Sequence, residues 1–242
     1  MSLNSDGSSR PDIARQVEAE KQLEISLAAE KEVRLGELGR VRNNLQIMIS
    51  LLELQAATTR NQQAREAFKV SRDRLKAMAF AHEGLFPSRG RSEVDLADCT
   101  SRLVKHLFSS YDARGIEPLV DVGRILLDID QAIPCVLIIN ELVSNALKHA
   151  FPAVSSPLLA ESRNGYTIRV EMHVQDGHYI LAISDNGVGF PAEVDLRSTT
   201  SLGMQLVTML AKQLGGAIQL DRSGGTTFTI TFQGGKLGKP LL

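Results

Sequence analysis

Apolar residues recur at helical spacing through the N-terminal third of the chain. They alternate steps of three and four in two runs: Leu38, Val41, Leu45, Met48 and Leu52, then Ala64, Phe68, Ser71, Leu75, Met78, His82 and Leu85. This spacing is typical of an apolar seam along a helix. A polar break at residues 58–63 separates the runs. We therefore predict two antiparallel helices joined by a short turn, with the first helix covering residues 11–57.

The hairpin has a charged extension before it and a boundary after it. Residues 13–33 are rich in helix formers and weakly periodic, which indicates a solvated helical stalk. The polar residues 1–12 are predicted to be a disordered tail, and PSRGRS at 87–92 breaks the helical pattern. We assign residues 13–88 to the stalk and hairpin, 92–236 to a second domain and 237–242 to a tail. Two helices alone leave an apolar flank exposed, so the hairpin is expected to form a four-helix bundle in a homodimer.

The second domain mixes helical and alternating segments, which predicts an α+β domain with an antiparallel-rich sheet and its helices on one face. A hairpin is expected around Asp176 and Gly177, and Pro134 is expected in the first turn of its helix. The predicted helices are 96–111, 134–150 and 201–214, and the predicted strands are 124–129, 166–175, 178–184, 217–220 and 226–232.

Composition excludes several classes of function. The formal net charge of −1 over 242 residues gives no bulk affinity for nucleic acid. Cys99 and Cys135 lack metal-ligand spacing, and their number suits a reducing compartment. The apolar runs are too short to span a membrane, and the N-terminus lacks a signal-peptide core. We expect a cytoplasmic chain with no membrane segment.

One predicted helix presents polar groups suited to a magnesium nucleotide. In IINELVSNALKHAFP, Glu141, Asn145 and Lys148 stand at i, i+4 and i+7 and therefore share a face. A carboxamide oxygen can ligate Mg²⁺, an ammonium can neutralise phosphate, and a carboxylate can take a proton. A solvated helix face is the alternative interpretation of the same residues.

Two glycine-containing stretches follow that helix. SDNGVGF at 184–190 places Asp185 ahead of two glycines, although an Asn-Gly turn alone would explain it. TSLGMQLV at 200–207 places Gly203 at a helix start, where backbone amides attract phosphate oxygens. Each stretch alone is a weak indication of nucleotide binding. The order and spacing of the helix and the two stretches make the pattern more specific.

Residues 96–232 as an ensemble resemble the GHKL ATP-binding fold, an α/β sandwich also called the Bergerat fold. The resemblance implies that Asn145 holds Mg²⁺, that Asp185 receives the adenine amino group and that Thr226 lies beside that aspartate. It also implies that Glu141 is the general base of the ATPases in the group. The glycines that shape the nucleotide lid are matched by Gly187, Gly189 and Gly203. Lys148 completes the set expected to bind ATP.

The helical hairpin, residues 35–88, is similar to the dimerisation and phosphoacceptor domain of type-2 histidine kinases. GRVRNNLQ matches the stretch that follows a pair of histidines in that family, of which the second accepts phosphate from ATP. Leu38 and Gly39 hold those two places here. Glycine has no nucleophile, so autophosphorylation at residue 39 is chemically impossible. His82 is interpreted as a core or supporting histidine rather than a substitute acceptor.

Asn43 stands four residues after Gly39, on the same helical face. In other histidine kinases that dephosphorylate their response regulators, an amide or hydroxyl at this offset is thought to orient water. The resemblance is partial because Arg40 stands where those families carry an acid, and Arg40 and Arg42 are suited to holding a phosphoryl group. We therefore expect a signalling protein that binds Mg-ATP and a response-regulator receiver domain, as a phosphatase or non-autophosphorylating regulator. The alternatives are a sensor kinase whose acceptor was replaced and a non-enzymatic scaffold that sequesters the regulator.

Overall fold

The computed structural model describes residues 9–88, 91–152, 165–193 and 201–234. It contains two compact units, Met1–Asn43 and Asn44–Leu242, and the long helix α1 runs through the division between them. In the first unit, the described structure is the first part of α1, whose Arg15, Glu18 and Lys21 are exposed. The division does not fall at residues 88–92, so the second hairpin helix belongs to the same unit as the sheet.

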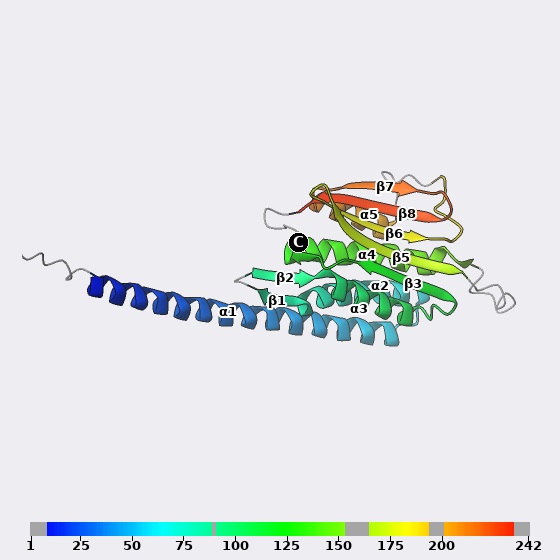
Figure 1. Cartoon of the computed structure of the whole chain (residues 1–242). Helices are drawn as coiled ribbons and strands as arrows, with labels where there is room; N and C mark the ends of the chain where they lie inside the picture. Colours follow the sequence, from blue (N-terminus) through cyan, green and yellow to red (C-terminus); the bar gives the residue numbers. More distant parts are fainter. Residues whose placement is uncertain (1–8, 89–90, 153–164, 194–200, 235–242) are drawn as a thin grey trace, which may run out of the picture. The chain divides into compact units, whose positions relative to one another are not determined.

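Helices and strands alternate irregularly along the chain (Figure 1). The helices are α1 (Ser9–Thr58), α2 (Gln62–Glu83), α3 (Leu96–Ser110), α4 (Ile129–His149) and α5 (Leu202–Gln213). The strands are β1 (Leu85–Ser88), β2 (Arg91–Asp95), β3 (Ile116–Val122), β4 (Leu126–Asp128), β5 (Tyr166–Gln175), β6 (His178–Asp185), β7 (Ala217–Asp221) and β8 (Thr226–Gln233).

The larger sheet has the strand order β3-β5-β6-β8-β7. The β3 and β5 strands are parallel, and the other neighbouring strands are antiparallel. Asp176 and Gly177 both have positive φ in the turn between β5 and β6, which confirms the predicted hairpin. The second sheet has the order β1-β2-β4.

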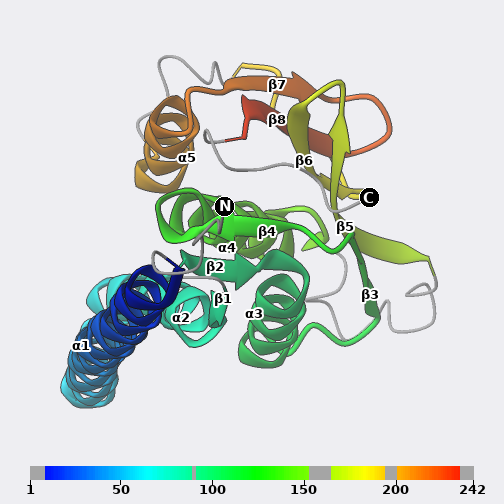
Figure 2. The same ribbon diagram turned by 60° about the vertical axis from the view of Figure 1, so that its left-hand side comes forward.

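The core lies between the five-stranded sheet and the helices α4 and α5, which cover the same face of it (Figure 2). Burial alternates along the central strands as expected for a sheet with one packed face. The inward residues are Ile168, Val170 and Met172 of β5, Tyr179, Leu181 and Ile183 of β6, and Phe228, Ile230 and Phe232 of β8. This arrangement confirms the predicted hairpin followed by an α/β sandwich.

Helix α4 begins five residues earlier than predicted. Asp128 caps it by accepting a hydrogen bond from the Gln131 N–H at 2.9 Å, and Pro134 lies inside the helix rather than in its first turn. The prediction was wrong because it placed proline by its preference for the helix start. The aspartate cap and the burial of most of α4 compensate for the backbone hydrogen bond that Pro134 cannot donate.

The seam between α1 and α2 also differs from the prediction. Leu45 and Ile49 are buried against Ala79, whereas Met48 is 48% exposed. The less exposed positions on α1 continue at Leu52 and Ala56, so the alternation of four and three is kept, with Ile49 in the place predicted for Met48. Apolar side chains remain exposed next to it on the same helix, namely Ile47, Met48, Leu51 and Leu54.

Both cysteines are free and buried, and burial raises the pKa of the Cys99 thiol to about 12. Across the ranges that the structure describes, every helix is too short or too polar to cross a membrane.

Candidate functional site

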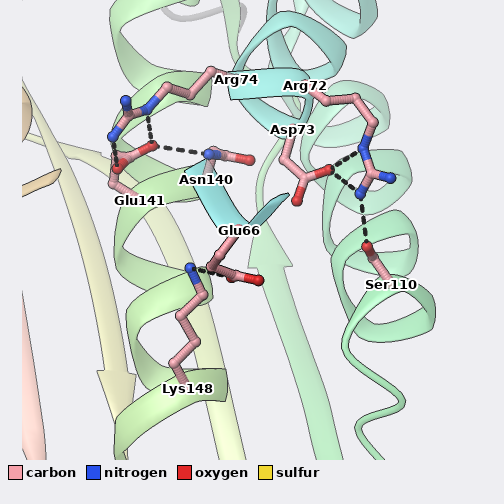
Figure 3. Close-up of polar contacts among 8 residues, drawn as sticks. All are labelled: Glu66, Arg72, Asp73, Arg74, Ser110, Asn140, Glu141 and Lys148. Carbon is pink, nitrogen blue, oxygen red and sulfur yellow. Dashed lines mark hydrogen bonds and ion pairs between the residues drawn. The ribbon is translucent and has the colours of Figure 1, made fainter. Parts of the chain in front are cut away.

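Glu141 lies on the buried side of α4, where it is only 4% exposed. Arg74 of α2 donates to both of its carboxylate oxygens, from Nε to Oε1 at 2.8 Å and from Nη2 to Oε2 at 2.7 Å (Figure 3). Asn140 adds a hydrogen bond from Nδ2 to Oε1 at 3.0 Å. Burial of a carboxylate requires such partners. Sequence patterns gave no indication that α2 would supply one of them.

Lys148 also faces α2. Its Nζ lies 3.4 Å from Oε1 of Glu66 and 5.4 Å from the centre of the Tyr111 ring. The ammonium is thereby paired with a carboxylate and stacked on an aromatic face. Two of the three residues predicted to face the nucleotide, Glu141 and Lys148, thus have charged partners on one helix (Figure 3).

Asn145 has its neighbours on α5. Its Nδ2 lies 3.6 Å from the Met204 sulfur, and a Cβ added at Gly203 would lie 2.9 Å from Oε2 of Glu141. A larger residue at position 203 would therefore have to displace the Glu141 carboxylate. The structure brings Glu141, Asn145 and Gly203 together at the start of α5, which is where the sequence placed a phosphate-binding helix terminus.

Asp185 ends β6 beside Thr226 of β8, its partner in the sheet register. The Gly187 N–H donates to Asp185 Oδ1 at 3.0 Å. Burial raises the pKa of the Asp185 carboxyl, and hydrogen bonds from Gly187 and Thr226 partly oppose that effect. The side chain is thus a partly buried acceptor held in a fixed orientation.

Glycines allow the backbone around Asp185 to approach its neighbours closely. A Cβ at Gly187 would lie 2.2 Å from the Ala150 carbonyl oxygen, and the adjacent Val188 N–H donates to that oxygen at 2.9 Å. Gly189 has φ +85°, in the left-handed region that favours glycine. Gly225, at φ +125°, lies against Asp185, where a Cβ would be 2.0 Å from the Asp185 carbonyl oxygen. Gly225 was not among the predicted residues, although the Gly-Gly pair before TTFTITF was an indication of it.

The residues fit a nucleotide better than a metal ion alone. Within the described ranges, no group of three or more His, Cys, Asp or Glu side chains could hold a metal. Mg²⁺ commonly takes one or two protein ligands and completes its shell with water and phosphate oxygens. Asn145 is suited to that role, and Gly203 and Gly225 allow the backbone to approach Glu141 and Asp185 more closely than a residue with a side chain would permit.

Gly39, Arg40 and Asn43 lie in the first compact unit, whereas the residues above lie in the second. On α1, Gly39 and Asn43 are one turn apart, and Arg40 and Asn43 are exposed. A Cβ at Gly39 would meet no described atom within 4 Å outside its own helix backbone and adjacent residues. The helix thus has room for a side chain at the position of the missing acceptor.

Three of the five histidines have structural surroundings, namely His82, His106 and His149. His82 is half-buried, and burial lowers the pKa of its imidazole. His106 packs edge-on against Phe80, with ring centres 6.0 Å apart, and its Nε2 lies 3.6 Å from Asp73. Burial and the adjacent Lys148 lower the pKa of His149.

Replacing Gly187 with alanine should damage both the fold and nucleotide binding. The added methyl group has to displace Ala150 at the end of α4, and overpacking of this kind costs about 1–3 kcal/mol of unfolding free energy. We expect at least about a tenfold loss of ATP affinity because Asp185 is displaced with its neighbour. Gly123→Ala is the matched control, since no described atom lies within 4 Å of its Cβ position. Equal unfolding midpoints and ATP affinities for the two variants would contradict the close approach.

Two family models match the chain. One, described as "Histidine kinase", matches residues 39–111, and the other, described as "Histidine kinase-, DNA gyrase B-, and HSP90-like ATPase", matches residues 130–235. The first match begins at Gly39 and continues through α3. The second covers the residues gathered around Asp185 and Glu141.

Curated relatives share these regions. Sensor histidine kinase PdtaS of Mycobacterium tuberculosis is 31% identical over 210 residues, which cover 84% of this chain and 40% of the relative. PdtaS of Mycolicibacterium smegmatis is 32% identical over 194 residues, covering 77% of this chain and 36% of the relative. The chain thus spans well under half the length of these two relatives.

A solved structure supports the fold. The histidine kinase domain from the Erythrobacter litoralis EL346 blue-light activated histidine kinase has a TM-score of 0.59 and 18% identity. The superposition covers 77% of this chain and 95% of that one. At this identity the likeness concerns the arrangement of helices and strands alone.

Proposed function

The chain belongs to the two-component sensor histidine kinase family, and we propose that within it the chain binds Mg-ATP and acts on a response regulator without phosphorylating itself at the usual position. The observation that carries the proposal is the glycine at residue 39. An acceptor needs a nucleophilic atom, and glycine has none. The activity left to such a chain is to remove phosphate from the regulator, or to control the regulator by binding it.

Asn43 is the residue we propose for dephosphorylation. It is exposed on α1 one turn from Gly39, and its carboxamide can orient a water molecule toward an aspartyl phosphate. Arg40 and Arg42 are also exposed on this helix and can bind phosphoryl oxygens through charge-assisted hydrogen bonds. Hydrolysis then needs no protein nucleophile.

The nucleotide roles rest on the site around α4. Asn145 would hold Mg²⁺, Asp185 would accept from the adenine amine, and Lys148 would neutralise phosphate. The ion supplies neutralisation of phosphate charge when it is bound. Glu141 would serve as the general base for hydrolysis. The partly buried carboxylate of Asp185 and the close approach of Gly203 to Glu141 support this assignment.

A homodimer through the hairpin is part of the proposal. Four exposed apolar side chains follow one flank of α1, and burying them against a second hairpin would complete a four-helix bundle. They are Ile47, Met48, Leu51 and Leu54. Light scattering should give twice the chain mass, and a monomer at micromolar concentration would contradict this part.

The lifetime of phosphate on a receiver domain tests the function. A receiver domain that binds the chain is phosphorylated with acetyl phosphate, and its decay is followed with and without the chain. We expect faster decay with the chain, and Asn43→Ala should slow the catalysed decay by about ten- to a thousandfold without weakening binding. Asn44→Ala is the matched control, because this exposed neighbour points about 100° away around the helix.

Two other outcomes of this experiment would change the proposed role of the chain. If Asn43→Ala weakens binding of the receiver domain, the residue docks the regulator and does not orient water. If the chain binds the receiver domain but leaves its phosphate lifetime unchanged, the phosphatase proposal fails and a sequestering scaffold remains.

A further inference from the structure

Helix α2 contacts the nucleotide-binding domain through the residues assigned to catalysis. The two ion pairs between α2 and α4 are Arg74 with Glu141 and Glu66 with Lys148 (Figure 3). Their α4 members are the proposed base and the proposed phosphate ligand. A helix of the phosphoacceptor-like hairpin therefore holds two side chains on which the ATP site depends.

The inner pair is Arg74 with Glu141. Both carboxylate oxygens accept from the guanidinium, and the side chains are only 18% and 6% exposed. Both oxygens of the carboxylate are thus already occupied by charge-assisted hydrogen bonds, and burial separates the group from water. In this arrangement neither oxygen is free to contact a water molecule or a nucleotide.

The outer pair, Glu66 with Lys148, defines how α2 is aligned along α4. Glu66 and Arg74 are eight residues apart on α2, and their partners are seven apart on α4 in the opposite chain direction. Both pairs thus belong to one antiparallel alignment of the two helices. Displacing α2 along α4 by one turn would bring Arg74 level with Leu137 or Asn145 and leave Glu141 without its cation. The contact therefore favours one position of α2.

Packing around the pairs keeps α2 close to α4 and α3. Ala77 and Ala81 are fully buried, and their small side chains permit close approach of the helices. Arg72 donates to Ser110 of α3 at 3.1 Å, and Arg102 of α3 pairs with Glu83 of α2. The contact with α3 does not involve any proposed nucleotide residue, so it can persist when the pairs to α4 separate.

We propose that α2 is an inhibitory latch on the ATP site, with Arg74 as its main contact and Glu66 as its secondary contact. While α2 is latched, Glu141 and Lys148 are engaged, and productive binding of Mg-ATP requires both pairs to open. The latch rests on the proposed function, because it needs Glu141 and Lys148 to act on the nucleotide. In this latch, docking of α2 weakens nucleotide binding. Because coupling between two binding events is reciprocal, nucleotide binding equally weakens the docking of α2.

Affinity for a non-hydrolysable ATP analogue with Mg²⁺ tests the latch. If only the unlatched fraction binds, then Arg74→Gln, which removes the cation from Glu141, should tighten binding by about fivefold or more. Glu66→Gln opens the more exposed pair and should tighten binding less, by up to about fivefold. Lys76→Gln is the matched control, because Lys76 lies on the same helix but pairs with Glu53 of α1 at 3.1 Å. It should leave the affinity unchanged.

Amide hydrogen exchange on the unmodified chain supplies a second measurement. Saturating analogue should accelerate exchange in α2, because nucleotide and latch compete, and should slow exchange around Asp185. If Arg74→Gln does not fold, Glu66→Gln and this exchange difference decide the matter.

The outcomes separate the latch from the proposed function. Equal affinity of the unmodified chain and Arg74→Gln, or slower α2 exchange with analogue, would overturn the latch and leave nucleotide binding intact. Weaker binding by Arg74→Gln would make Arg74 a supporting residue of the site and also overturn it. If neither the unmodified chain nor any variant binds the analogue, the proposed function fails and the latch fails with it. Binding by Arg74→Gln alone would be the strongest support for the latch.

Discussion

Asp185→Asn should lower ATP affinity by about ten- to a hundredfold. The carboxylate accepts from the Gly187 N–H and from Thr226, and it would also accept from the adenine amine. An amide keeps one oxygen for Gly187 and turns its NH₂ toward the adenine, so that two donors face each other. Losing a hydrogen bond to a charged group costs about 1.5–3 kcal/mol, and each 1.4 kcal/mol is about tenfold in affinity. Titration calorimetry with Mg-ATP measures the effect.

Asp221→Asn is the matched control in the same domain. Asp221 ends the edge strand β7, is exposed and accepts a backbone hydrogen bond from Ser223 at 2.9 Å. It pairs in the sheet with Thr227, whereas Asp185 pairs with Thr226, so the substitution is chemically identical but changes neither partner of Asp185. It should leave ATP affinity unchanged. If both variants bind ATP as the unmodified chain does, Asp185 does not contact the adenine.

Gly39→His should convert an unlabelled chain into one that takes up acid-labile phosphate from labelled ATP. The substitution restores an imidazole at the acceptor position of the family, one turn from Asn43 on α1. It should also raise local helix propensity by about a few tenths of a kcal/mol. Space for the side chain exists within the described structure, since no described atom outside its own helix backbone and adjacent residues lies within 4 Å of the Cβ position.

Gly39→Ala is the control that separates the effect of a phosphate-accepting side chain from the effect of higher helix propensity. It improves the helix without adding a nucleophile and should remain unlabelled. Labelling of the unmodified chain, mapped to His82, would overturn our interpretation of His82 as a supporting residue. If Gly39→His binds ATP but stays unlabelled, more than the nucleophile is missing, and the scaffold interpretation gains support.

The sequence alone was enough to predict the helices and strands that are specified by residues close together in the chain. The seam residues gave the helical hairpin, and the Asp176-Gly177 turn gave the register of β5 and β6. These features depend on neighbours a few residues apart, so spacing alone reveals them. The order of Asn145, Asp185 and Gly203 likewise carried the resemblance to the ATP-binding fold, and residues 130–235 match an ATPase family model.

Strand β3 was missed for a physical reason. Its sequence IEPLVDV does not alternate, and only Ile116 in it is buried. It is an edge strand paired with β5 alone, and such an edge tolerates Pro118, which has no N–H to donate to a sheet ladder. The parallel pairing joins segments about fifty residues apart, so no local pattern records it.

Tertiary structure alone decided what surrounds helix α4. The sequence placed Glu141, Asn145 and Lys148 on one helix, but it did not show that Arg74, 67 residues before Glu141, would take up both carboxylate oxygens. Helical spacing specifies which side chains share a face, whereas the partner of that face is set by the packing of α2 against α4. The partner matters because Glu141 is buried: a carboxylate removed from water needs a cation, and the fold supplies Arg74.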